Sequence, residues 1–268
     1  MTYKASIIKD SIAPCGKRLI TATLTYPRMI HPELLTHRVL SRNVSSSRAI
    51  PVKKLLQSII EDPAQPVFWG ANQAGMQSYV ELIGFRLKLS QFLFLQSRWI
   101  MICIVWCLMK LNLHKQLANR LLEPWAHVTS IVSATELENF FSLRRTPHAQ
   151  PEMKKIAELF AIEIENSVPN YLQENEWHLP FVEDHELSKY DIDTLIQLSV
   201  ARCARVSYLT HDGKRNIEKD IQLAKDLIKD RHLSPTEHQG RAESSQIQSG
   251  NFIGFTQYRK TIVGESGT

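Results

Sequence analysis

The sequence predicts an α+β protein, and three observations favour that class. Residues 19–27 (LITATLTYP) partly alternate in polarity and are rich in β-branched side chains, which is typical of a strand. Residues 152–168 and 216–230 carry apolar side chains at helical spacing, which predicts amphipathic helices. Because no long linker or internal repeat interrupts the 268 residues, we expect one compact domain.

Two prolines mark the starts of the first predicted helices. Proline suits the first turn of a helix because its missing N–H would have no partner there. We therefore expect helices over 32–43 and 51–62. Gly and Pro cluster in 63–75, which predicts a loop, and a long helical stretch should follow over 77–122.

The apolar part of that stretch, within 85–113, is unusual. Residues 92–113 are long and apolar enough to span a bilayer. Arg98 lies in the first third of this segment, and the uninterrupted apolar run covers only 99–109. Both observations favour a buried core helix or an interface helix over a membrane span.

A capping box over Ser133 to Glu136 predicts the start of another helix. Its apolar stripe contains Leu137 and Phe140, and Arg144 continues the same face. At the end of a helix a cation also complements the helix dipole. A partly buried guanidinium needs an acceptor, which is either a neighbouring Glu or a bound ligand.

Near the C-terminus, Asn216 should cap the helix over 216–230. The following stretch HLSPTEH (232–238) brings two His and one Glu together. Pro235 excludes the helix that an H-E-x-x-H zinc site requires, so we expect a polar turn and no metal site.

Positive charge is concentrated in the first 60 residues. They contain ten Lys or Arg against two acidic residues, a formal charge of +8, whereas the whole chain carries +5. Such a region favours an anionic partner: a nucleotide, a nucleic acid or a membrane surface. The four cysteines form no C-x-x-C pair and no signal peptide is evident, so we expect reduced thiols and a cytoplasmic location.

The stretch LLTHRVLSRNVSSSRAIP (34–51) lies in this basic region and contains no acidic residue. Three arginines, Arg38, Arg42 and Arg48, lie within eleven positions beside His37. One interpretation is a solvated Ser-rich turn. The other is an anion site, because hydroxyls, backbone N–H groups and arginine forks bind phosphate. Neither a Rossmann nor a P-loop glycine motif is present.

Three segments together resemble the flavin-dependent thymidylate synthases (ThyX). THRVLSRNVSSSR (36–48) is similar to the family's Arg-His-Arg, seven residues, Ser, then Arg. NRLLEP (119–124) and ENFFSLRRTPHAQPEM (138–153) resemble its second motif region, and ARVSY (204–208) with HLSPTEH resembles its third. This chain has Thr36, Val44 and Ala49 where the family has Arg, Glu and Tyr.

The resemblance implies a fold with a central, mostly antiparallel sheet and long helices. It implies methylation of dUMP to dTMP, with methylenetetrahydrofolate as carbon donor and NADPH and FAD as reductants, in a homotetramer. By resemblance, Ser46, Ser47, Arg48 and Arg120 would bind dUMP; Thr36, His37, Arg38, Asn139 and Ser234 would bind FAD. Arg144 would lie against uracil and favour its N3-deprotonated form, which enriches C5.

In the family, the HLSPTEH-like motif precedes Arg-His-Arg, whereas here it follows everything else. The chain is therefore similar to a circularly permuted, phage-type relative. We divide the single domain into a nucleotide and flavin motif (19–51), a helical part (52–180) and a C-terminal flavin motif part (195–268). The permutation predicts that Ser234 and His37 flank one pocket, with 19–27 beside the C-terminal part.

Three other functions stay open at this point. One is a relative that keeps the nucleotide and flavin pocket but lacks synthase activity, which Thr36 and Val44 motivate. Another is a basic nucleic-acid binder, although aromatic residues are missing from 34–51. The last is a membrane protein. We expect dUMP and a second copy of the chain as partners, with no nucleic acid and no membrane.

Overall fold

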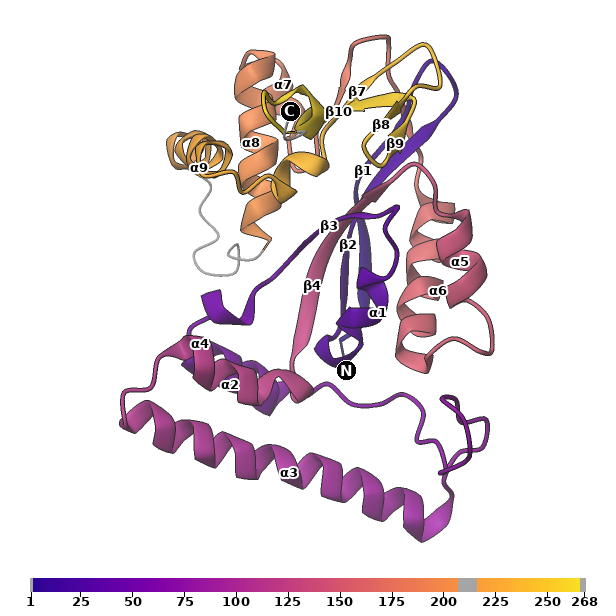
Figure 1. Cartoon of the computed structure of the whole chain (residues 1–268), viewed down its shortest axis with the longest axis vertical. Coiled ribbons are helices and arrows are strands. Elements are labelled where there is room, and N and C mark those ends of the chain that lie inside the picture. The colour runs from indigo at the N-terminus through magenta and orange to yellow at the C-terminus, as the bar shows by residue number, and fades with distance from the viewer. Residues whose placement is uncertain (1, 207–215, 266–268) are drawn as a thin grey trace.

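The computed structural model describes residues 2–206 and 216–265 and has an α+β architecture (Figure 1). Its centre is a five-stranded sheet with the order β3-β4-β2-β1-β5. All neighbouring pairs are antiparallel except β1 with β5. The strands are β1 (Lys4–Ile12), β2 (Arg18–Pro27), β3 (Ser41–Val44), β4 (His127–Ala134) and β5 (Asn170–Tyr171). The predicted class and the strand over 19–27 are thus confirmed.

Two helices cover the sheet beside β1 and β2: α5 (Glu138–Arg144) and α6 (Pro151–Asn166) (Figure 1). α6 begins where the side chain of Gln150 accepts from the backbone N–H of Met153. Its apolar stripe, including Ile156 and Phe160, packs with Phe140 of α5 against the sheet. This buried face confirms the amphipathic pattern of 152–168.

The helix expected over 32–43 is wrong over most of its length. The helical segment consists of η1 (Arg28–Ile30) and α1 (His31–Leu35), and β3 then begins at Ser41. Ser41 to Val44 pair with Ser133 to Ser130 of β4. The sheet therefore supplies tertiary partners for backbone groups that local helical spacing would pair within a helix.

The long helical stretch over 77–122 divides into separate elements. α2 (Val52–Glu61) precedes it as expected, and the stretch itself contains α3 (Gly84–Lys110), α4 (Lys115–Ala118) and η3 (Asn119–Trp125). Gly84 and Asn112 have φ angles of 59° and 61°. This left-handed conformation cannot continue an α-helix, so α3 begins and ends at these points.

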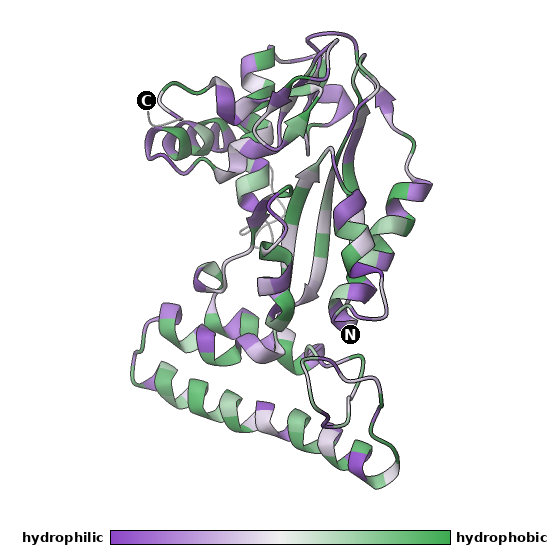
Figure 2. Ribbon diagram, turned by 45° about the vertical axis from the view of Figure 1, so that its right-hand side comes forward, coloured by the Kyte–Doolittle hydropathy of each residue, from purple (hydrophilic) through white to green (hydrophobic). Residues whose placement is uncertain are grey.

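α3 lies along one end of the molecule, and Figure 2 shows apolar residues over its length. Its inner face packs on α2 and η3 through Phe94, Met101 and Val105. Its outer face, including Phe92 and Ile100, is exposed. Within a single chain, α3 is therefore not a fully buried core helix. The alternative, that α3 is an interface helix, stays a prediction.

The two thiols of α3 are exposed as well, so Cys103 and Cys107 do not pack inside the chain. By length and composition alone, α3 is the one helix in the described ranges that is long and apolar enough to cross a membrane.

The capping box at Ser133 to Glu136 is also wrong. Ser133 lies inside β4, and α5 begins after Leu137, which supplies no side-chain cap. The Ser133 hydroxyl instead contacts Thr21 Oγ1 at 2.6 Å and His238 Nδ1 at 2.9 Å. Ser133 is thus part of a buried hydrogen-bond network that joins β2 and β4 to the C-terminal region.

The C-terminal region forms a second layer of helices and short strands at the end of the molecule opposite α3 (Figure 1). Asn216 caps α9 by accepting from the N–H of Lys219, as predicted. Ser207 and Tyr208 of the ARVSY segment lie outside the described residues. The elements are β6 (Trp177–His178), α7 (Asp184–Leu187), α8 (Ile192–Arg205), α9 (Ile217–Lys229), η4 (Ser234–Glu237), β7 (Gly240–Ala242), β8 (Gln248–Ser249), β9 (Phe252–Ile253), β10 (Phe255–Gln257) and η5 (Tyr258–Thr261).

The start of β2 contacts this C-terminal layer, as the sequence predicted for 19–27. Leu19 is fully buried in one apolar cluster with Phe252 and Phe255. A Cβ added to Gly240 would lie 2.8 Å from Leu19 Cδ2, so the absence of a side chain permits this close approach. β9 and β10 belong to separate small sheets but adjoin the central one, because Ile253 N donates to Thr135 Oγ1 at 3.0 Å.

Candidate functional site

Arg144 ends α5 and reaches back to the basic stretch. Its Nε donates to His37 Nε2 at 2.7 Å, and its Nη2 donates to Thr36 Oγ1 at 3.0 Å and to the carbonyl of Glu33 at 3.3 Å. The expected partial burial is confirmed, since the residue is half-buried. These acceptors are neutral, and no ion pair joins Arg144 to a carboxylate among the residues that the structure describes.

The third guanidinium nitrogen of Arg144, Nη1, makes no hydrogen bond with the residues that the structure describes. The Nε and Nη2 contacts fix the plane of the group, which leaves Nη1 as an oriented donor. Nearby, Glu33 Oε2 is buried without a partner among the described residues. A free donor and an orphaned acceptor in one cluster fit a ligand that carries both kinds of group.

His37 is a buried, neutral member of this cluster. Burial is the main cause that lowers the pKa of His37, and the charges of Arg144 and Arg42 lower it further. The ring meets Phe140 edge-on, with 4.9 Å between centroids. Because Nε2 accepts from Arg144, the ring proton lies on Nδ1, where it can serve a ligand.

The Ser-rich part of the stretch forms a tight turn, η2 (Ser47–Ala49). Asn119 holds it: its Nδ2 donates to the carbonyls of Ser47 at 2.7 Å and Ile50 at 2.9 Å. Asn119 is fully buried and directly precedes Arg120. Arg120 therefore follows a residue that is anchored to the turn carrying Ser46 and Arg48.

Arg38, Arg48 and Arg120 are all exposed, and none forms a hydrogen bond or ion pair with the described residues. Most other arginines here are paired; Arg18, for example, binds Asp10. Unpaired guanidinium groups beside serine hydroxyls are suited to bind an anion.

Sequence reasoning missed two residues next to this turn, Arg28 and Glu123. Glu123 Oε1 accepts from Ser47 Oγ at 2.5 Å and lies 3.1 Å from Arg28 Nε. Arg28 Nη1 also donates to the carbonyl of Ser45 at 3.2 Å. Glu123 follows Arg120 in the segment NRLLEP, but nothing local indicates a contact with a serine 76 positions earlier.

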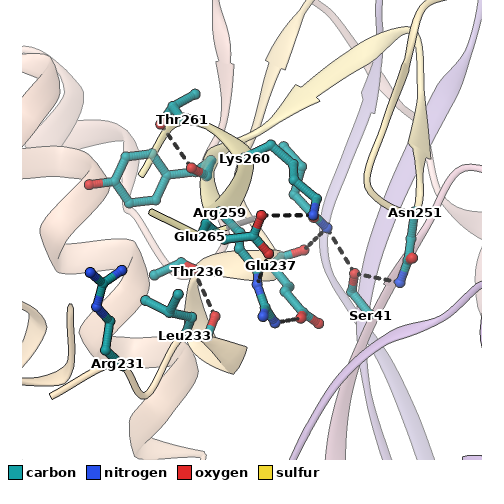
Figure 3. Close-up of polar contacts among 12 residues, drawn as sticks. Ser41, Arg231, Leu233, Thr236, Glu237, Asn251, Arg259, Lys260, Thr261 and Glu265 are labelled. Carbon is teal, nitrogen blue, oxygen red and sulfur yellow. Dashed lines mark hydrogen bonds and ion pairs between the residues drawn. The ribbon is translucent and has the colours of Figure 1, made fainter. Parts of the chain in front are cut away.

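The remaining predicted flavin residues are surface residues of separate elements. Asn139 is exposed in α5, and Ser234 is exposed at the start of η4. Gln257 fastens η4 to β3, because its Nε2 donates to Ser41 Oγ and to the carbonyl of Glu237, both at 3.0 Å (Figure 3). Ser234 therefore belongs to an element held against the strand that follows His37 and Arg38.

Ion pairs join η4 to η5. Arg259 binds the carboxylates of both Glu237 and Glu265 (Figure 3). His232 is exposed whereas His238 is buried, and the described ranges contain no group of three or more His, Cys, Asp or Glu that could hold a metal ion.

The model of one protein family, described as thymidylate synthase complementing protein, matches residues 18–170. The match covers more than half of the chain and includes both the 36–48 stretch and Arg144. The chain therefore belongs to this family, which confirms the ThyX resemblance. Ser234 lies outside the match, and the permuted order stays a prediction.

No protein of curated function matches the chain in sequence. Among solved structures, the chain is similar to a UMP/dUMP methylase, PolB, from Streptomyces cacaoi bound with 5-Br UMP. That likeness has 15% identity and a TM-score of 0.45, over 59% of this chain and 86% of the other. It is also similar to ThyX from Helicobacter pylori with FAD and dUMP, at 17% identity and a TM-score of 0.38, over 55% of this chain and 67% of the other.

Proposed function

We propose that this protein is a flavin-dependent thymidylate synthase that converts dUMP to dTMP. Methylenetetrahydrofolate would supply the carbon and become tetrahydrofolate, and the C5 hydrogen of uracil would leave as a proton. FAD, when bound and reduced by NADPH, would supply the hydride that completes the methyl group. The observation that carries this proposal is the anchored but uncompensated charge of Arg144.

Arg144 would act on the uracil ring. C5 of uracil is a weak nucleophile, and electron density there rises when the ring carries negative charge on its N3 side. The fixed guanidinium, with Nη1 free to donate, would stabilise that charge without reorganising. Partial burial strengthens the effect, because less water screens the charge.

The phosphate of dUMP would bind at the turn of Ser46, Ser47 and Arg48, with Arg120 beside it. Serine hydroxyls and two guanidinium groups that have no partner among the described residues can satisfy the oxygens of a phosphate, provided that Ser47 leaves its present acceptor, Glu123. The fully buried Asn119 supports this role, because it fixes the turn and precedes Arg120.

The flavin would be held by Thr36, His37 and Arg38, together with Asn139 and Ser234. The donor set fits an anionic cofactor: Arg38 has no partner within the part of the chain that the structure describes, and His37 carries its proton on Nδ1. Cationic and N–H donors stabilise the pyrimidine end of a reduced flavin, which is anionic. The attachment of η4 to β3 through Gln257 supports a shared site for Ser234 and the 36–38 stretch.

We also propose that the protein is a homotetramer. The exposed apolar outer face of α3 supports burial against another copy, since contiguous apolar surface of this kind is rare on monomers. We further expect a cytoplasmic enzyme without nucleic-acid or membrane partners. Light scattering after gel filtration tests the assembly, and cell fractionation tests the location.

Purified protein tests the function directly. Its absorbance spectrum should show bound flavin, and it should form dTMP from dUMP when methylenetetrahydrofolate and NADPH are both present. Omitting either co-substrate should stop the reaction. Flavin binding without dTMP formation would instead indicate a relative that keeps the pocket but lacks synthase activity, a possibility that Thr36 and Val44 raise.

A further inference from the structure

A carboxylate of the chain itself occupies part of the proposed phosphate site. Glu123, in η3, accepts from the hydroxyl of Ser47 at 2.5 Å and pairs with Arg28 at 3.1 Å. The Glu123 and Arg28 side chains are about three-quarters buried, at 24% and 21% exposure. Two donors next to the Ser46–Arg48 turn are therefore already bound to an anion.

A cavity of about 390 Å³ opens beside this contact. Its cationic side consists of Arg28 and the unpaired Arg120, and Glu123 is its one acidic lining residue among those described. His31 also lines it, with Nδ1 at 2.8 Å from the Tyr26 hydroxyl. The cavity has the size and charge for a small anionic group, and the Glu123 carboxylate already pairs with one of its two arginines, Arg28.

Glu123 and a bound phosphate cannot both use these donors fully. The Ser47 hydroxyl has one proton and Arg28 Nε has one N–H, so each donates to one acceptor well. A phosphate at the turn would also lie close to the Glu123 charge, and like charges at short range repel. Binding must therefore release or displace the carboxylate.

We propose that Glu123 is a competing carboxylate, which holds Ser47 and Arg28 in the ligand-free chain and gives them up when a phosphate group binds. The inference deepens the proposed function and rests on its phosphate site. Displacing the carboxylate then costs free energy only for ligands with a phosphate group, so Glu123 lowers the affinity for nucleotides and leaves the affinity for uncharged nucleosides unchanged. The opposite role, in which Glu123 orients Ser47 for the ligand, predicts the reverse effect of substitution.

Titration calorimetry on the full-length protein separates the two roles. The ligands are dUMP, inorganic phosphate and deoxyuridine, and the variants are Glu123→Gln and a matched control, Glu158→Gln. Glu158 lies on α6, is half-exposed and pairs with Lys154, so its substitution changes the net charge equally, away from the cavity. Glu123→Ala replaces the Gln variant should that variant not fold, as judged by circular dichroism.

If Glu123 competes, Glu123→Gln should bind dUMP and inorganic phosphate about tenfold more tightly. A tenfold change in affinity is what an interaction free energy equal to one pKa unit produces. Deoxyuridine affinity and the Glu158→Gln control should not change. Weaker or unchanged phosphate binding in Glu123→Gln overturns the inference. Tighter phosphate binding while dUMP binds to no variant would support the competition but contradict the proposed function.

Discussion

Arg144 donates through Nε to Nε2 of His37 at 2.7 Å, which joins the end of α5 to a residue 107 positions earlier in the chain. The bond has two consequences. It fixes the guanidinium plane while Nη1 stays free, and it keeps His37 neutral, because a protonated ring cannot accept. One contact therefore orients the Arg144 guanidinium, which we propose acts on uracil, and keeps neutral the His37 ring, which we propose binds flavin.

Replacing Arg144 by Ala should reduce dTMP formation about 100- to 1,000-fold, the usual cost of losing a fixed donor to transition-state charge. Flavin should stay bound, since Arg38, Asn139 and Ser234 are unchanged. Lys should rescue poorly because it cannot reproduce the planar fork. Arg145→Ala is the matched control, since that neighbour is exposed and lies over the Phe141 ring. Full activity of Arg144→Ala would rule out the assigned role.

Replacing Arg48 by Ala should weaken dUMP binding by about 10- to 150-fold, which corresponds to about 1.5–3 kcal/mol for charge-assisted hydrogen bonds. Flavin affinity should change less. Calorimetric titration with dUMP measures the effect, and Arg86→Ala on α3, also exposed and unpaired within the described ranges, controls for net charge. Equal losses in both variants would indicate only general charge attraction.

Gln257 should stabilise the join between η4 and β3. Gln257→Leu leaves the Glu237 carbonyl without this donor and leaves Ser41 Oγ with the longer contact from Asn251 at 3.4 Å. We expect a loss of about 1–3 kcal/mol in the free energy of unfolding, measured by urea denaturation, together with weaker flavin retention. Gln222→Leu on α9 is the exposed control. Unchanged flavin retention would separate Ser234 from the flavin site.

The buried Arg202 should be the most sensitive ion-pair residue of the C-terminal layer. It is 2% exposed and binds both oxygens of Glu186 at 2.6 Å. Arg202→Met would leave an unpaired buried carboxylate, which should cost about 3–5 kcal/mol. The double variant with Glu186→Leu should recover much of that loss, as chemical denaturation can measure. No recovery would mean that Arg202 stabilises the fold through other contacts.

Acid should destabilise the fold through two buried histidines. Burial lowers the pKa of His238 to about 3, and burial with the charges of Lys9 and His238 lowers the pKa of His178 well below its usual value. Because each folded pKa lies below the unfolded value near 6.5, the unfolded chain binds more protons in that window. Stability is therefore complete above pH 6.5 and falls as pH decreases toward 3.

Each buried histidine should contribute a slope of about 1.4 kcal/mol per pH unit in that window. Denaturation at pH 7, 6 and 5 measures the slope. His238→Asn, which can still reach Ser133, should remove about half of it, whereas the exposed His185→Gln should remove none. A slope that survives the His238 substitution intact would assign the acid effect to other groups.

Local patterns predicted the elements whose periodicity and capping residues lie within the element itself. The strand over 19–27, the helix capped by Asn216 and the stripe of α6 each follow from periodicity and capping. The helix over 32–43 failed because β4 pairs with 41–44 from almost ninety residues away. Ser133 failed for the same reason, since its partners Thr21 and His238 are distant.

The candidate site shows the same limit. Residue type and spacing were enough to single out the 36–48 stretch and Arg144. Spacing could not predict the hydrogen bond from Arg144 to His37 or the one from Ser47 to Glu123. These contacts depend on how η3 and α5 lie against the sheet. α3 shows a third case: its composition predicts burial, but the chain alone supplies a partner for one face.

One titration tests most directly whether the 36–48 stretch and Arg144 form a shared nucleotide and flavin site. dUMP is added to flavin-loaded protein while the visible absorbance of the flavin is recorded. We expect a saturable change in the flavin band, shifted to higher dUMP concentration in Arg48→Ala and unaltered in Arg86→Ala. A protein that retains no flavin, or a flavin band that does not respond to dUMP, would rule out a shared nucleotide and flavin site.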